Sequence, residues 1–300
     1  MLSRGVAYMA LSALGFSAMS VLVKLAARDL PTGEIVLARA VMTLGISYVM
    51  VKRVGLSPWG TRRGKLLVRG LLGFSALAGY YIALARLPLA DATTLQNVQP
   101  LITAILAWRI LGERIGWATV IAIACGITGV MLVVHPGVGA VADPAGLAIA
   151  LSSATLSSIA YVTVRQLTAP RLQPDGTERA GEHPLVIVFY FPLVAAPLSV
   201  PWAAMDLVVP SATGWLLLAA IGVTTQLGQV FLTKGLAIEK AGRATSVGYI
   251  QICFAIVWQL VIFGEMPALG TVAGAALIIA GTLAVSATAT RGAARPRTAT

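Results

Sequence analysis

The chain has 300 residues, of which 58% are hydrophobic and 11% are charged, and its formal net charge is +11. A soluble domain carries about a quarter charged residues, so this composition excludes an ordinary soluble globular protein. A strongly basic chain can indicate nucleic-acid binding, but the basic residues here stand between apolar runs, as the loop charges of membrane proteins do. The composition therefore predicts an integral membrane protein that binds no nucleic acid.

The apolar runs are long enough to cross a bilayer as helices, which takes about 20 residues each. They lack the alternation of barrel strands, so an all-α integral membrane fold is expected. The first run is too long for the core of a signal peptide and is expected to remain as a span. In chain order, we expect ten transmembrane helices at 5–27, 33–52, 66–86, 91–111, 116–134, 145–168, 184–203, 212–236, 243–263 and 268–289. A mobile polar tail over 291–300 should follow them.

The Lys and Arg residues predict the orientation, because short cytoplasmic loops carry an excess of both. With the N-terminus in the cytoplasm, all but four of the 22 basic residues fall on the cytoplasmic side, and Arg69, near the start of the third span, is counted there with the basic residues of the preceding loop. The four exceptions are Lys24, Arg28, Arg39 and Arg86. An even number of spans then places both termini in the cytoplasm, and the expected location is a bacterial cytoplasmic (inner) membrane.

The sequence also repeats itself. Shifted by 152 residues, Gln99 matches Gln251 and the pair Gly112–Glu113 matches Gly264–Glu265. Five helices per repeat is an odd number, so the second repeat should insert upside down relative to the first. Inverted repeats are typical of transporters, which bind substrate near the midplane between the repeats. The predicted domains are 1–140 and 141–290.

Two five-helix halves, each closing its fourth helix with a Gly–Glu pair, resemble the drug/metabolite transporter superfamily and its EamA domains. The resemblance covers essentially the whole chain, and within that group the sequence is similar to the YddG-type amino-acid exporters of bacterial inner membranes. It implies two inverted EamA-like repeats that export amino acids or similar small metabolites. It also implies a cavity lined by the first, third, fourth, sixth, eighth and ninth helices.

Polar side chains inside the spans are the candidate substrate-binding residues, because polar groups are costly in a bilayer. The fourth span is the richest, with five amide and hydroxyl side chains between Thr93 and Gln99, directly before Pro100. This density favours a neutral, hydrogen-bonding cavity, whereas isolated serines favour close packing of helices. The predicted substrate-binding residues are Tyr80, Tyr81, Thr94, Asn97, Gln99, Tyr161, Gln229, Ser246 and Tyr249.

Arg39 is the most prominent ion in the spans and lies about two turns into the second one. It is expected to act in gating or charge pairing, by neutralising Glu34, with direct contact to a substrate carboxylate as the alternative. No Asp or Glu lies clearly at the centre of a predicted span, so proton coupling through a buried acid is not expected. The simplest mechanism is then facilitative transport by alternating access.

Other function classes stay open to different degrees. An exporter of drugs or nucleotide precursors, with proton coupling as an option, is the main alternative, although a nucleotide should require several inward cations and Arg39 is the one candidate. A sensor or scaffold without transport is another. An enzyme would need acid, histidine or metal clusters at membrane depth, and His135 and His183 fall in loops. We therefore expect no enzyme, cofactor or metal site, but a monomer in the lipid bilayer that binds a small-molecule substrate such as an amino acid.

Overall fold

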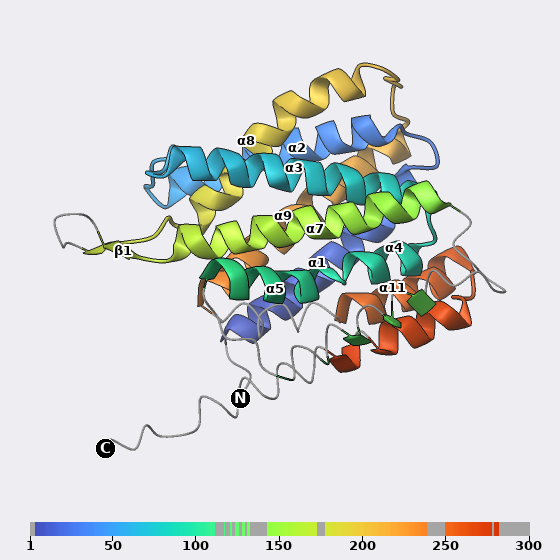
Figure 1. Cartoon of the computed structure of the whole chain (residues 1–300). Helices are drawn as coiled ribbons and strands as arrows, with labels where there is room; N and C mark the ends of the chain where they lie inside the picture. The colour runs from blue at the N-terminus through green and yellow to red at the C-terminus, as the bar shows by residue number, and fades with distance from the viewer. Residues whose placement is uncertain are drawn as a thin grey trace.

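The computed structural model describes residues 4–111, 143–172, 178–238, 250–277 and 279–281, with a few single positions between 117 and 132. Over these residues the chain is a bundle of helices lying side by side, with a small hairpin at one end (Figure 1). The helices are α1 (Arg4–Ala26), α2 (Thr32–Arg53), α3 (Arg63–Arg86), α4 (Leu89–Gln96), α5 (Gln99–Leu111), α7 (Pro144–Thr168), α8 (Pro184–Ala203), α9 (Ala212–Ile238) and α11 (Ile250–Phe263). The hairpin strands are β1 (Arg171–Leu172) and β2 (Glu178–Arg179), which pair antiparallel.

Six helices are long and apolar enough to cross a membrane, namely α1, α2, α3, α7, α8 and α9. The spans predicted for these six segments agree with the observed helices to within about three residues. Shorter apolar helices cover Cys253–Phe263 and Leu269–Gly281. The predicted span 116–134 lies largely outside the described residues, as do the start of 243–263 and the end of 268–289.

The fourth predicted span, 91–111, consists of two helices, so the prediction of one continuous helix is wrong. Helix α4 ends at Gln96 and α5 begins at Gln99, and the two follow one another along the bundle (Figure 1). Pro100 explains the interruption, because it has no backbone N–H to bond the carbonyl four residues earlier. The side chain of Asn97 stabilises the end of α4 by donating from Nδ2 to the Thr93 carbonyl at 2.8 Å.

The main packing partners of the long helices come from the other half of the chain. Helix α1 packs along α9, α2 along α8, and α3 along α7. Small residues allow the closest approach, since a Cβ atom added to Gly15 of α1 would lie 3.0 Å from the backbone nitrogen of Gly228 on α9. Such small-residue contacts are the usual way in which membrane helices pack closely.

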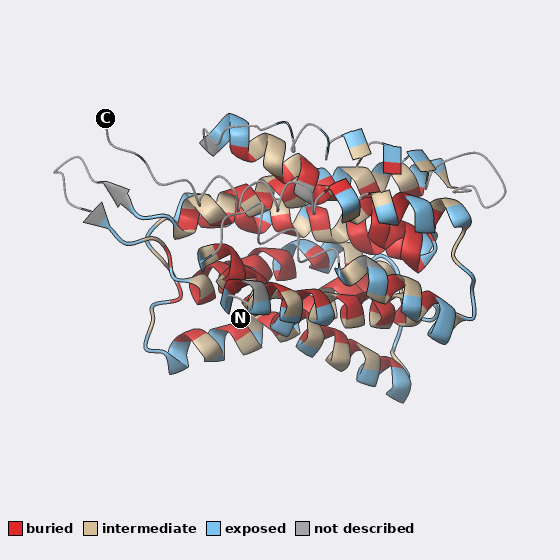
Figure 2. Ribbon diagram, turned by 90° about the horizontal axis from the view of Figure 1, so that it is seen from below, coloured by how far each residue is buried: buried red, intermediate tan, exposed pale blue. Residues whose placement is uncertain are grey.

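Buried residues gather on the inward faces of the helices, and exposed residues on the outward faces (Figure 2). Many outward side chains are large and apolar, including Val49, Leu71, Leu198, Val223 and Leu260, which are 41–49% exposed. An apolar surface spread over several helices suits contact with lipid chains rather than water.

Polar contacts hold the loops at both ends of the bundle. Glu182, just before α8, accepts hydrogen bonds through Oε1 from the backbone nitrogens of Thr61 at 2.8 Å and Arg62 at 2.5 Å, and from the Thr61 hydroxyl. The segment between α7 and α8, which carries strands β1 and β2, therefore anchors the α2–α3 loop through Glu182. At the opposite end, Arg86 forms an ion pair with Asp143. The Arg86 guanidinium holds the pKa of the Asp143 carboxyl below its usual range.

Candidate functional site

A cavity of about 110 Å³, lined by both polar and apolar side chains, lies within the bundle. Its lining residues come from α1, α2, α3, α4, α5, α7, α8, α9 and α11, so both halves of the chain contribute to it. A single water needs only about 10–15 Å³ by the same measure, so the cavity has room for a small solute or several waters.

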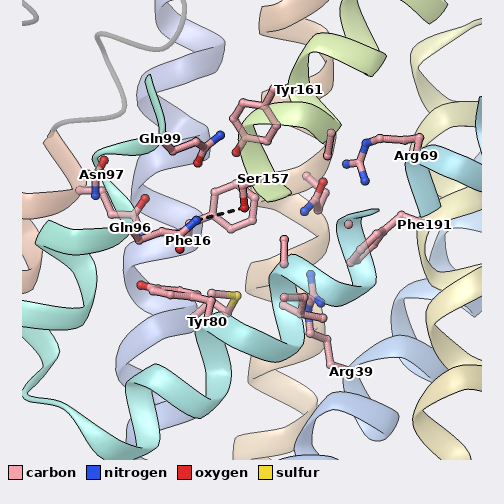
Figure 3. A pocket seen from close by; sticks show the side chains of 17 residues that line it. Phe16, Arg39, Arg69, Tyr80, Gln96, Asn97, Gln99, Ser157, Tyr161 and Phe191 are labelled. Atoms are coloured by element: carbon pink, nitrogen blue, oxygen red, sulfur yellow. Dashed lines mark hydrogen bonds between the residues drawn. The ribbon is translucent and has the colours of Figure 1, made fainter. Parts of the chain in front are cut away.

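One wall of the cavity carries amide and aromatic groups, among them Gln96, Asn97, Gln99, Tyr80 and Tyr161 (Figure 3). In a continuous helix, residues 96 and 99 would share a face and residue 97 would point away from it. The interruption between α4 and α5 falls at Asn97, and all three amide side chains line the cavity.

Helix α7 holds this interrupted segment in place. The Gln96 amide donates from Nε2 to the Ser157 hydroxyl at 3.1 Å, and its Oε1 accepts from the Ser153 hydroxyl at 3.0 Å. The Ser158 hydroxyl donates to the backbone carbonyl of Gln99 at 2.9 Å. Serines that the sequence favours as packing residues thus also orient the amide wall.

Tyr80 connects three helices at the edge of the cavity. Its hydroxyl shares a hydrogen bond with Ser20 of α1 at 3.0 Å and lies 3.4 Å from the Thr93 hydroxyl of α4. Both contacts are buried, so the ring has a fixed position from which its face lines the cavity.

Arg39 of α2 lies on the other side of the cavity and is only 1% exposed. Its Nε donates to the Thr225 hydroxyl of α9 at 3.1 Å, and its guanidinium carbon lies 5.1 Å from the ring centroid of Phe191. A guanidinium at this distance from an aromatic ring gains cation–π stabilisation. Among the described residues, Nη1 of Arg39 has no hydrogen-bond partner.

Arg69 of α3 is the second cation of the cavity, and it is 3% exposed. Its guanidinium carbon lies 5.4 Å from the centroid of the same Phe191 ring, and neither Nε nor Nη1 has a hydrogen-bond partner in the described part of the chain. Gly73, one turn further along α3, makes room for this arrangement. A Cβ atom there would overlap Arg69 Nη1 and would lie 2.6 Å from Phe191 Cδ2.

Arg69 therefore differs from the basic residues of the α2–α3 loop, with which the sequence groups it. The helix begins at Arg63 rather than at the expected residue 66, which places Arg69 almost two turns inside it. Arg63 and Lys65 are exposed and are consistent with the loop assignment, whereas Arg69 turns inward. If the helix is taken to begin at residue 63, Arg69 lies almost two turns from its start, and this depth is the sequence signal that separates it from Arg63 and Lys65.

The two arginines give the cavity its electrostatic character. Its lining contains no Asp, Glu, Lys or His among the described residues, so its formal charge comes from Arg39 and Arg69 alone. Because both guanidinium groups lie near one ring, their carbons are at most about 10.5 Å apart. At an effective dielectric constant of about 20, two like charges at that separation repel by roughly 1.5 kcal/mol. Figure 3 shows Phe191 between them, opposite the amide wall.

The predicted site residues divide into three groups. The cavity is lined by Tyr80, Asn97, Gln99, Tyr161, Gln229 and Arg39. Tyr81 and Thr94 are fully buried but are not among the lining residues, and the Tyr81 ring lies 5.7 Å from the Arg39 guanidinium carbon. Ser246 and Tyr249 lie outside the described residues.

Glu34 takes a different partner from the one expected. Its Oε2 accepts a hydrogen bond from the backbone nitrogen of Val208 at 3.2 Å, in the segment between α8 and α9. In the part of the chain that the structure describes, no ion pair joins it to Arg39. Glu34 therefore anchors a loop, and Arg39 faces the cavity without a carboxylate beside it.

Sequence reasoning missed Phe16, Arg69 and Phe191 as cavity residues. The two phenylalanines lie in continuously apolar runs, where nothing in the pattern separates an inward ring from one that faces lipid. Gln96, Ser157 and Gln251 stand out as polar residues in the sequence, and the cavity includes them too.

A cavity with polar groups between membrane-spanning helices from both halves of a chain is typical of the class of solute transporters. The EamA-like transporter family matches residues 3–135 and 144–287. The chain belongs to this family, and it is therefore a multi-pass membrane transporter with two EamA domains and not an enzyme.

Individual relatives cover most of the chain. It is 35% identical over 297 residues to the pseudopaline exporter CntI of Pseudomonas aeruginosa, covering 96% of this chain and 98% of the relative. It is 31% identical to human solute carrier family 35 member G1, over 92% of this chain and 77% of that one. The S-adenosylmethionine uptake transporter of Rickettsia prowazekii is 27% identical over 72% of this chain and 69% of its own length. A solved crystal structure shares the fold, with a TM-score of 0.67, 18% identity, and coverage of 94% of this chain and 98% of that chain.

Proposed function

We propose that this protein exports amino acids or similar small metabolites across a bacterial cytoplasmic membrane, by facilitative alternating access. The observation that carries the proposal is the cavity between the two halves, with amide and tyrosine groups on one wall and two cations on the other. Its lining offers hydrogen bonds to polar solutes, and rocking of the two halves about it would expose it to each side in turn.

The proposal includes ten spans in two inverted five-helix repeats, at 1–140 and 141–290. The packing supports this arrangement, because swapping the two halves of the chain reproduces the same set of helix–helix contacts. If α1, α2 and α3 correspond to α7, α8 and α9, then the α1–α9 contact has α3–α7 as its counterpart, and α3–α8 has α2–α9. The α2–α8 contact is then its own counterpart, as expected next to a pseudo-twofold axis.

The direction and location are also proposals. The exposed basic residues of the α2–α3 loop favour a cytoplasmic position for that loop, and so for both termini. Export is supported by the pseudopaline exporter, which the chain matches over 96% of its length. The relative named for S-adenosylmethionine uptake supports small metabolites as the general substrate class, and it leaves the direction to be measured.

An exporter of nucleotide precursors or drugs, with proton coupling, is the second candidate. Arg69 favours it, because a nucleotide requires several inward cations and the cavity has two. Asp91 favours proton coupling, since this carboxyl at the start of α4 is 5% exposed and accepts a hydrogen bond from the Thr271 hydroxyl. The sequence does not single out Asp91, because it lies at the edge of the expected span rather than at its centre.

Transport by the purified protein in liposomes tests these candidates. Radiolabelled amino acids should show saturable flux in protein-containing vesicles and none in empty ones, whether or not a pH gradient is imposed. Flux that requires a gradient and disappears in Asp91→Asn would replace facilitative transport by proton coupling. Flux of nucleosides or nucleotides with none for any amino acid would favour the second candidate. Absence of flux for every class would contradict transport as proposed.

A further inference from the structure

We propose that the substrate carries two separate anionic groups, one bound by Arg39 and one by Arg69, joined by a segment that lies against the Phe191 ring. The inference rests on the proposed function, because it specifies the solutes that the same cavity carries. The inference narrows the predicted substrate class from small metabolites in general to compounds such as amino dicarboxylates or phosphorylated amino acids.

The unsatisfied hydrogen-bonding groups around the cavity are the first argument. In the described part of the chain, the buried side-chain nitrogens without a hydrogen-bond partner are Arg39 Nη1, Arg69 Nε and Nη1, and Gln99 Nε2. All three residues line the cavity. Each nitrogen is a donor, so the cavity requires acceptors, and buried donors are normally paired. A ligand rich in anionic oxygens can supply acceptors where these three residues line the cavity.

The missing counter-charge is the second argument. A buried guanidinium is unfavourable unless an anion pairs with it, because burial removes its hydration. Arg39 has one hydroxyl partner and Arg69 has none among the described residues, and no carboxylate lies within ion-pair distance of either one. Helices of this membrane bundle could present Gln or Met at these positions if packing were their only role. Arginine, unlike either of these, binds carboxylate or phosphate oxygens in a bidentate manner.

The geometry offers positions for two anionic groups. The guanidinium carbons of Arg39 and Arg69 lie 5.1 Å and 5.4 Å from the centroid of the Phe191 ring (Figure 3). Each guanidinium can therefore bind an anionic group of its own beside the ring. A short apolar or polar linker along the ring can bring a second anionic group to the second arginine. The remaining polar part of the solute then faces Gln96, Asn97 and Gln99 on the opposite wall.

Matched probes that differ by one anionic group test this inference. Glutamate and glutamine are nearly isosteric, and O-phosphoserine and serine provide a second pair in which phosphate is the additional anion. We would measure binding of each probe to the purified protein by calorimetry, and transport in liposomes by counterflow. The wild-type protein should prefer the member with two anionic groups by at least about tenfold, and the pair with the larger preference distinguishes carboxylate from phosphate as the second group.

Charge-neutral variants then assign the preference to the arginines. Arg39→Gln and Arg69→Gln should each reduce the preference by at least about tenfold, while Arg69→Lys should retain part of it. The controls are Arg53→Gln on α2 and Arg63→Gln on α3, which remove exposed arginines from the same two helices and should leave the preference unchanged. Variants are compared only after each elutes as a monodisperse peak in detergent.

The outcomes separate the inference from the proposed function. Equal affinity for both members of each pair, or a preference that survives both Arg→Gln changes, would overturn the inference, and amino-acid flux would still support the proposed function. Binding that follows the predicted charge preference without any transport would support the site and overturn the carrier. Neither binding nor transport of any probe would overturn both.

Discussion

Gly73→Ala adds one methyl group behind Arg69 without changing any charge. The new Cβ would lie 2.6 Å from Phe191 Cδ2 and would overlap Arg69 Nη1. Carbon atoms in ordinary contact are about 3.5–4.0 Å apart, so the ring has to retreat by about 1 Å and the guanidinium has to take another rotamer. Because both groups line the cavity, we expect weaker substrate binding together with lower stability.

Gly45→Ala on α2 is the matched control, since a Cβ atom there would meet nothing within 4 Å. Both changes gain the helix propensity of alanine, up to about 1 kcal/mol, so this gain cancels in their difference. Overpacking typically costs about 1–3 kcal/mol, which should appear as a lower midpoint of thermal unfolding in detergent for Gly73→Ala than for Gly45→Ala. Equal midpoints and equal transport in the two variants would refute the packing of Arg69 against Phe191.

Three further predictions concern the cavity and the loops. Asn97→Leu should reduce flux in liposomes by at least about tenfold without reducing the amount of protein in the membrane, because Asn97 lines the cavity and its amide is replaced by an apolar group; normal flux would remove it from the site. Glu182→Gln should destabilise the fold by roughly 1–3 kcal/mol, seen as a lower unfolding midpoint, because it removes the charge that binds the α2–α3 loop. Asp206→Asn, at an exposed carboxylate, should leave the midpoint unchanged. The Arg86 guanidinium lowers the pKa of Asp143 in the folded state, so its stabilisation is present above the ordinary aspartate pKa of about 3.9 and is lost as pH falls through the lower folded value; the difference in midpoint between the wild type and Asp143→Asn should shrink between about pH 5 and pH 2.

The long helices are predictable from sequence because length and apolar composition are sufficient to define them. Helix α8 is a clear case, since its predicted and observed bounds coincide at residues 184 and 203 despite Pro192, Pro197 and Pro201 inside it. Proline interrupts α4–α5 and not α8, a difference that a count of prolines cannot anticipate. Near Pro100, the polar side chain of Asn97 competes for backbone groups. In α8, Pro192 is buried whereas Pro197 and Pro201 are exposed, so burial of the proline does not explain why this helix continues.

The candidate site is only half predictable. Polar residues in apolar runs, such as Asn97 and Gln229, are recognisable as candidates, because burying a polar side chain in a bilayer is energetically unfavourable unless it has a function. Both residues line the cavity. Arg69 is not predicted as a cavity residue, because its exposed neighbours Arg63 and Lys65 make the whole segment resemble a charged loop. Phe191 is not predicted either, because an aromatic ring in an apolar run is equally favourable facing lipid or facing the interior. The packing of α3 against α8 decides that it faces the interior.

The packing of α2 against α8 and α9 has a consequence for the biosynthesis of the protein. The chain is made from its N-terminus, so α2 reaches the membrane when the ribosome has still to translate more than a hundred residues before Phe191 and Thr225. Until then, the Arg39 side chain lacks the ring and the hydroxyl that surround it in the folded protein. Because Arg39 lies about two turns from the start of α2, its long side chain can reach the polar headgroups during this interval. Nascent α2 can therefore span the bilayer before α8 and α9 arrive, and the Arg39 side chain takes its inward position only when the second half has been made.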